Sequence, residues 1–177
     1  MHIASASFDP SSVAKLTLNN SAVSDNTQLD TGGVDGLGGG GIVNILGTLT
    51  LNNSQANGNT ANGFVGGGIA NGDYISFSDT SSVLTLNNSQ VNGNTAPNAG
   101  GGGVQNLLGT VTVNGSQVNG NSSLNGGGIS SGNGNGGSPG PTSHLTLNKS
   151  QVNGNTATAP VPTPGSGGGP PIAGGGI

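Results

Sequence analysis

Apolar and polar residues alternate over short segments that recur along the chain. One eleven-residue phrase, Leu-Thr-Leu-Asn followed by a polar turn and then Val-x-Gly-Asn, is found five times with small variations. Its copies begin at Leu16, Leu49, Leu84, Val111 and Leu145. Strict alternation over the first residues of each copy predicts a β-strand with its leucines on one face and its threonine on the other.

Runs of glycine that end in Ile or Val separate the copies, at Ile42, Ile69, Val104, Ile129 and Ile177. The copies begin 33, 35, 27 and 34 residues apart. Such a period is typical of a solenoid in which each repeat forms one coil and extra residues bulge out at the corners. The sequence therefore predicts an all-β parallel β-helix of about five coils, with three short strands each and a minimal coil of 27 residues. The general rule for parallel crossovers makes the helix right-handed.

Domain limits follow from the same repeats. We expect residues 13–177 to form a single β-helix domain and residues 1–12 to be an N-terminal extension. The longer coils contain more residues than the minimal coil. We expect these additional residues to form corner insertions near 28–38, 72–82, 131–143 and 157–173.

The expected core consists of four ranks, a rank being the set of equivalent positions in successive copies. Each rank repeats about every 4.8 Å along the axis, which is the spacing of neighbouring strands. A single coil could not bury its apolar face alone, so stability must come from its neighbours. The ranks are Leu16, Leu49, Leu84, Val111, Leu145; Leu18, Leu51, Leu86, Val113, Leu147; Val23, Ala56, Val91, Val118, Val152; and the Ile42 rank.

Two further ranks are asparagine in every copy, and both are predicted to be structural ladders, because stacked amides can hydrogen-bond along the axis as in cross-β assemblies. Continued alternation would carry Lys149 into the core, where an unpaired ammonium group is too costly. We therefore expect a turn near the first rank, with its asparagines inward. Asp25 or a glycine precedes each member of the second rank, and these residues tolerate positive φ. The two ranks are Asn19, Asn52, Asn87, Asn114, Asn148 and Asn26, Asn59, Asn94, Asn121, Asn155.

The alternation of Gly-Gly-Gly-Ile-x-Asn with Leu-Thr-Leu-x-x-Ser-x-Val-x-Gly-Asn-Thr resembles the repeats of secreted bacterial parallel β-helix proteins. These include the polymorphic outer-membrane proteins and autotransporter passengers. The Gly-Gly-Gly-Ile phrase lies at residues 39–42, 66–69, 126–129 and 174–177, and the resemblance covers residues 13–177. It implies a right-handed β-helix at the bacterial cell surface or outside the cell. Such coils serve adhesins, stalks, phage spikes and polysaccharide-cleaving enzymes alike, so the resemblance is specific for fold only.

Composition argues against several classes of function. Only 5% of the residues are charged, the net charge is −4, and Lys15 and Lys149 are the only basic side chains besides two histidines, so no basic surface for nucleic acid is expected. Cysteine is absent, the histidines are single, and the glycine runs lack the Lys-Ser/Thr of a phosphate-binding loop, so no metal or cofactor is expected. No apolar run is long enough to insert into a membrane, and no export signal follows Met1.

One insertion resembles a ligand site more than the others do. It contains Asp73, Tyr74, Phe77 and Asp79. The two acids could converge as in a glycoside hydrolase, and the aromatic rings could form a sugar platform. The alternative is that Ile75 and Phe77 simply cover the side of the solenoid, and this alternative is favoured.

Ice binding is a second alternative. Thr17, Thr50, Thr85, Thr112 and Thr146 form one outward rank of threonines. The neighbouring outward rank is less regular, which weighs against ice binding because an ice-matching face should be regular in both directions. That rank reads Lys15, Thr48, Val83, Thr110 and His144.

The regular features all serve stacking, and none concentrates reactive groups. The sequence therefore predicts a non-enzymatic extracellular structural or adhesive module. We also expect uncapped ends, since neither carries an amphipathic helix or a charged strand. The expected partner is the chain itself, stacked coil on coil into a filament, or else a longer surface stalk; surface glycans are a further candidate partner. The alternatives are an ice-binding protein and a carbohydrate-binding or polysaccharide-cleaving β-helix.

Overall fold

The computed structural model describes residues 2–4, 13–29, 39–63, 65–72, 81–132 and 142–158. These residues form fifteen β-strands and no helix. The strands are β1 (His2–Ala4), β2 (Lys15–Asn19), β3 (Thr27–Gln28), β4 (Ile42–Ile45), β5 (Thr48–Asn52), β6 (Thr60–Ala61), β7 (Ile69–Gly72), β8 (Val83–Asn87), β9 (Thr95–Gly100), β10 (Val104–Leu107), β11 (Thr110–Asn114), β12 (Ser122–Asn125), β13 (Ile129–Gly132), β14 (His144–Asn148) and β15 (Thr156–Ala157).

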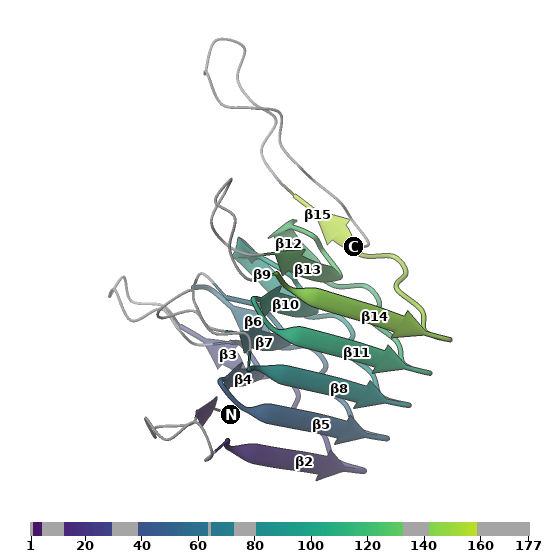
Figure 1. The fold of residues 1–177 in the computed structure, drawn as a ribbon. Coiled ribbons are helices and arrows are strands. Elements are labelled where there is room, and N and C mark those ends of the chain that lie inside the picture. Colours follow the sequence, from purple (N-terminus) through teal and green to yellow (C-terminus); the bar gives the residue numbers. More distant parts are fainter. Residues whose placement is uncertain are drawn as a thin grey trace.

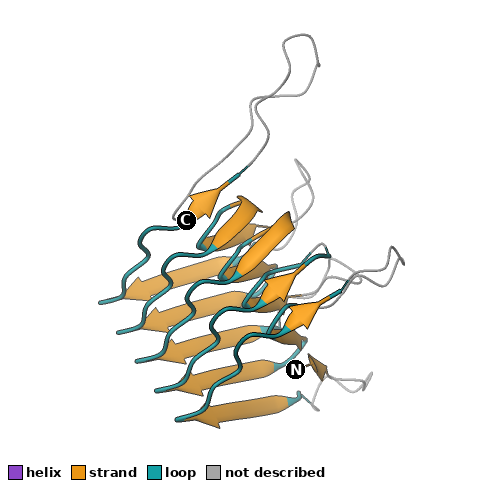
Figure 2. Cartoon of the chain, turned by 180° about the vertical axis from the view of Figure 1, so that it is seen from behind, coloured by secondary structure: helices purple, strands orange, loops and turns teal. Residues whose placement is uncertain are grey.

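The strands form three parallel sheets of five, and each coil contributes one strand to each sheet. Sheet 1 has the order β1-β4-β7-β10-β13, sheet 2 the order β2-β5-β8-β11-β14, and sheet 3 the order β3-β6-β9-β12-β15. In Figure 1 the strands of sheet 2 run from left to right in front, the chain returns behind them, and the stack rises from β2 to β14. Figure 2 shows the same stack from behind. The described residues therefore form a right-handed parallel β-helix of five three-stranded coils, as the sequence predicts.

Register in sheet 2 follows the repeated phrase without a slip. Leu16 pairs with Leu49, Leu49 with Leu84, and Leu84 with Val111. In sheet 1, Val104 pairs with Ile129, only 25 residues further on, so the shortest coil step is smaller than the predicted 27. The difference arises at a register shift in sheet 3. Ala96 of β9 pairs with Ser123 of β12 and Gly100 with Asn125, so β9 has two more residues than β12 between these pairs.

The core lies along the axis between the three sheets. It consists of the inward ranks that the alternation predicts. These side chains are buried in the three central coils and, for Ile129, at the start of the last described coil: Ile42, Leu49, Leu51, Ala56, Ile69, Leu84, Leu86, Val91, Val104, Val111, Val113, Val118 and Ile129. Each fully buried Val, Leu or Ile side chain contributes about 1.5–3 kcal/mol to the free energy of folding. Leu16, Leu18 and Val23 in the first coil, and Leu145 and Val152 in the last, are only partly buried. An inner coil is covered on both sides along the axis, whereas an outermost described coil is covered on one side.

Strands β4 and β7 of sheet 1 are buried on their outer face as well. Val43, Ile45, Val65 and Ala70 form a second apolar cluster, with Leu46 packed against it. The residue pattern does not predict this cluster, because the segments that carry it lack the regular alternation of sheet 2.

The chain termini and insertions fall partly outside the described residues. Residues 2–4, expected in an N-terminal extension, form β1 and pair with β4 in parallel, which gives the first coil its third strand. The greater part of the predicted insertions near 28–38, 72–82, 131–143 and 157–173 lies outside the described residues.

The glycine runs allow coils to approach closely at the corner between sheets 3 and 1. A Cβ atom added to Gly67 would lie 2.6 Å from the backbone oxygens of both Gly102 and Thr95. Backbone atoms of stacked coils cannot retreat without breaking the sheets, so glycine is required there. Gly132, at the end of β13, has no atom of the described residues within 4 Å of its added Cβ.

Gly67→Ala is therefore expected to lower the free energy of unfolding by about 1–3 kcal/mol, as overpacking commonly does. Gly132→Ala is the matched control and should leave stability nearly unchanged. Denaturant unfolding followed by circular dichroism measures both variants. Equal stability of the two variants would contradict the close-approach explanation of the glycine runs.

Candidate functional site

The inner asparagine ladder, formed by Asn26, Asn59, Asn94, Asn121 and Asn155, is a continuous polar feature with one member in each coil of the described stack. Asn94 is fully buried. Its Nδ2 donates to the backbone oxygen of Ala56 at 2.9 Å and to Oδ1 of Asn121 at 2.9 Å. Its Oδ1 accepts from the backbone N–H of Asn59 at 2.8 Å and from Nδ2 of Asn59 at 3.1 Å. Each amide of the three central coils thus binds the coils on both sides, and the predicted ladder is confirmed.

Left-handed turns set up this ladder. The residues immediately before it adopt positive φ, from 58° at Asp25 to 66° at Gly58. Glycine is the usual residue in this conformation, and aspartate tolerates it better than most. The prediction of a bend at this rank is therefore confirmed.

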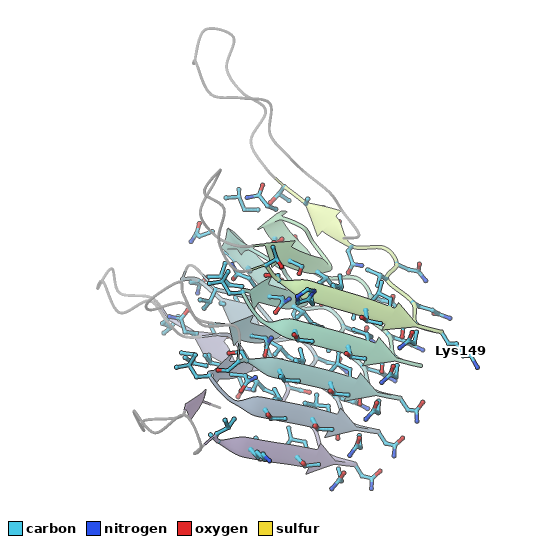
Figure 3. The ribbon with its side chains drawn as sticks, viewed as in Figure 1. Lys149 is labelled. Carbon is cyan, nitrogen blue, oxygen red and sulfur yellow. The ribbon has the colours of Figure 1, made fainter. Side chains whose placement is uncertain are left out.

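The outer asparagine ladder, formed by Asn19, Asn52, Asn87, Asn114 and Asn148, lies at the ends of the sheet 2 strands. Its amides are linked Nδ2 to Oδ1 at 2.8–2.9 Å. Its side chains are half-buried or exposed, so the expectation that they point inward is wrong. They lie on the outer face of sheet 2, as Thr17 does, because the turn comes one residue later than expected. It falls at Asn20 and its equivalents, whose φ is near 50°. Lys149 occupies this turn position after β14 and projects away from the stack (Figure 3).

A third ladder runs through sheet 1 and was not predicted. Asn44 donates from Nδ2 to Oδ1 of Asn71 at 2.7 Å, and Asn71 donates to Oδ1 of Asn106 at 2.9 Å. Asn106 in turn donates to Oγ of Ser131 at 3.0 Å. The signal was present in the repeated Gly-Gly-Gly-Ile-x-Asn phrase, in which the asparagine stands two residues after the buried Ile or Val.

Serines of the repeated phrase form a fourth ladder. The backbone N–H of Ser54 donates to Oγ of Ser89 at 3.1 Å, and the hydroxyl of Ser89 donates back to the carbonyl of Leu51 at 3.1 Å. Equivalent backbone-to-hydroxyl bonds join each serine to the next along the stack: Ser21, Ser54, Ser89, Ser116 and Ser150.

The two predicted asparagine ladders have opposite polarity along the axis. In the inner ladder each Nδ2 donates toward the C-terminal coil, and backbone N–H bonds to Oδ1, such as that from Asn59 to Asn94, fix this orientation. In the outer ladder each Nδ2 donates toward the N-terminal coil. At the first described coil, Oδ1 of Asn26 and Nδ2 of Asn19 have no hydrogen-bond partner among the described residues.

At the last described coil the pattern is reversed. Nδ2 of Asn155 donates only to the carbonyl of Val118, and Oδ1 of Asn148 has no donor within the described part of the chain. The first described coil therefore offers an acceptor on the inner ladder and a donor on the outer ladder. The last described coil offers a donor on the inner ladder and an acceptor on the outer ladder.

The expected ligand loop, with Asp73, Tyr74, Phe77 and Asp79, lies outside the described residues. Across the ranges that the structure describes, no group of three or more His, Cys, Asp or Glu side chains is arranged to hold a metal ion. No helix long and apolar enough to cross a membrane is found in those same ranges.

Replacement of Asn94 tests the inner ladder. Asn94→Ala leaves the N–H of Asn59 and the carbonyl of Ala56 without the partners they have in the native stack, and this region is closed to water. We expect the free energy of unfolding to fall by about 3 kcal/mol or more, because each unpaired buried polar group costs about 1–3 kcal/mol. Chemical denaturation measures the change.

Asn87→Ala, in the same coil, is the control. It removes two amide bonds of the outer ladder, where water can replace them, and should cost about 1 kcal/mol. A loss for Asn94→Ala no larger than that for Asn87→Ala would show that the inner ladder does not hold the coils together.

No protein-family model matches the chain, and neither a curated protein nor a solved structure matches it significantly. The resemblance to secreted bacterial β-helix repeats therefore remains a prediction from the repeated phrases, and function has to be argued from the ladders and the outer faces.

Proposed function

We propose that this chain is a non-enzymatic extracellular structural or adhesive module that extends its stack head to tail, coil on coil. The observation that carries the proposal is the complementarity of the two ends of the described stack. The first coil presents Oδ1 of Asn26 and Nδ2 of Asn19, and the last coil presents Nδ2 of Asn155 and Oδ1 of Asn148.

Stacking of a second copy would repeat the bonds found between inner coils. Nδ2 of Asn155 would donate to Asn26 of the next copy, and Asn19 of that copy would donate to Asn148. Both ladders would continue in register with their polarity unchanged. A reversed stack would oppose donors to donors in one ladder and acceptors to acceptors in the other, so the ladders favour one orientation.

Apolar surface at the same two ends supports the proposal. Leu147 is 36% exposed in the last coil, whereas its equivalents Leu51 and Leu86 are fully buried. Leu16 and Leu18 in the first coil are also only partly buried. An added coil would cover these side chains, and burial of apolar area contributes roughly 25 cal/mol per Å².

The low charge of the chain favours close association. Two Lys and six Asp leave a net charge of only −4, so little like-charge repulsion opposes contact between copies. The resemblance of the repeats to secreted bacterial β-helix proteins supports an extracellular or cell-surface setting, where a regular rod would serve as a stalk or a surface that binds glycans.

Electron microscopy of the purified chain tests head-to-tail stacking. The unmodified protein is expected to form filaments one solenoid wide at high concentration. Leu147→Lys should prevent them, because an inward-facing charge at an open edge blocks pairing. Thr146→Lys is the matched control, since it adds the same charge to an outward position of β14 and should leave filaments intact.

Circular dichroism confirms that both variants keep the β-helix. Discrete monomers of the unmodified chain at high concentration would overturn the stacking proposal, as would filaments of Leu147→Lys that match those of Thr146→Lys.

A further inference from the structure

Sheet 2 presents a regular outward surface, which we name the threonine face. It consists of the two outward ranks that precede the outer asparagine ladder on β2, β5, β8, β11 and β14. The five strands pair in register, so that Thr17, Thr50, Thr85, Thr112 and Thr146 form one unbroken row along the axis. In Figure 1 the strands of sheet 2 lie side by side as an even, nearly flat layer.

The irregular members of the second row lie at its ends. Lys15 is on β2 and His144 is on β14, which are the two outermost strands of the sheet. The three central strands carry Thr48, Val83 and Thr110 in this row. Valine has the shape of threonine with a methyl group in place of the hydroxyl, so the central part of the face is even in contour. It carries no charged side chain.

These side chains form a two-dimensional array with two fixed periods. Successive strands of a sheet are about 4.7–4.9 Å apart, and outward residues of one strand are about 6.6 Å apart. Outward side chains of the central strands are half-buried, because neighbours in the row support one another laterally. Threonine and valine are also stiff at χ1, so the array is ordered before it meets a ligand. A preordered surface loses little side-chain entropy on binding.

The chemistry of the array restricts its ligand. An uncharged face does not attract an ionic partner, and the threonine hydroxyls both donate and accept hydrogen bonds. Methyl groups between the hydroxyls favour ordered water at fixed positions over a mobile hydration layer. A ligand that matches must be neutral, must donate and accept hydrogen bonds, and must repeat in two dimensions.

We propose that the threonine face binds the surface of ice. The ice surface is neutral, consists wholly of donors and acceptors, and is periodic in two dimensions, with repeats of the same order as those of the array. Ice binding by this face does not require the proposed axial stacking, since the face runs along the side of the solenoid and the stacking surfaces lie at its ends.

Thermal hysteresis and the partition of the protein into slowly grown ice test this proposal. The unmodified chain is expected to show hysteresis and to enter the ice. Thr85→Tyr and Thr112→Tyr place a ring above the centre of the face and should abolish both effects. Gln117→Tyr is the matched control: it adds the same ring to the same coil as Thr112 but on the next wall, and it should behave as the unmodified chain. Circular dichroism and thermal unfolding establish that all variants remain folded.

Absence of hysteresis and of partition into ice for the unmodified chain would overturn the proposal. Equal loss of activity in Thr85→Tyr and Gln117→Tyr would also overturn it, because the effect would then not belong to this face. Binding to powdered chitin or cellulose without any effect on ice growth would assign the face to a crystalline polysaccharide instead. Val83→Thr, which adds a hydroxyl to the central row, should increase the hysteresis, and a decrease would count against the hydroxyl array.

Discussion

Hydrogen bonds between the side-chain amides of stacked asparagines are the interaction on which the solenoid depends. The chain must turn sharply several times in each coil, and a sharp turn leaves backbone groups without strand partners. In the inner ladder each asparagine satisfies a carbonyl of the preceding coil and a backbone N–H with one side chain, as Asn94 does with Ala56 and Asn59. Most buried polar groups in proteins are paired, because an unpaired one is costly in a medium of low dielectric constant. Asparagines at the same position of neighbouring coils supply the pairing. The stability of the stack therefore depends on the repetition of the sequence.

Apolar burial along the axis and polar pairing at the corners act in the same direction. Both improve when a coil has neighbours on both sides, which explains why the outermost described coils have partly buried leucines and, among the described residues, ladder atoms without a partner. In the proposed head-to-tail stacking, this property would give a linear stack a tendency to grow. The ladders add a direction to that tendency, because an amide has a donor end and an acceptor end and every member of a ladder is aligned with the next.

The sequence predicted the parts of the fold that follow from strict period-two alternation. The inward leucines of the repeated phrase, their register and the positive φ at Asp25 and its equivalents all appear as expected. Predictions were less successful where the alternation ends. The predicted inward direction of the Asn19 side chain was wrong, because the turn comes one residue later. Sequence alone does not fix which of two adjacent polar residues adopts positive φ. The Asn44 ladder and the Val43 cluster were missed because β4 and β7 are buried on both faces, and a strand buried on both faces shows no alternation. The candidate ligand loop at Asp73 stays a prediction.

Side-chain amide hydrogen exchange, followed by nuclear magnetic resonance in the native state, tests the ladder account most directly. The Nδ2 protons of Asn59, Asn94 and Asn121 are buried and doubly bonded, so they should exchange only when coils separate, with protection comparable to that of the central strand amides. The exposed Asn53 and Asn88 provide the internal reference and should exchange rapidly. Exchange of the inner ladder at the rate of Asn53 and Asn88 would contradict the claim that these amides hold the stack together.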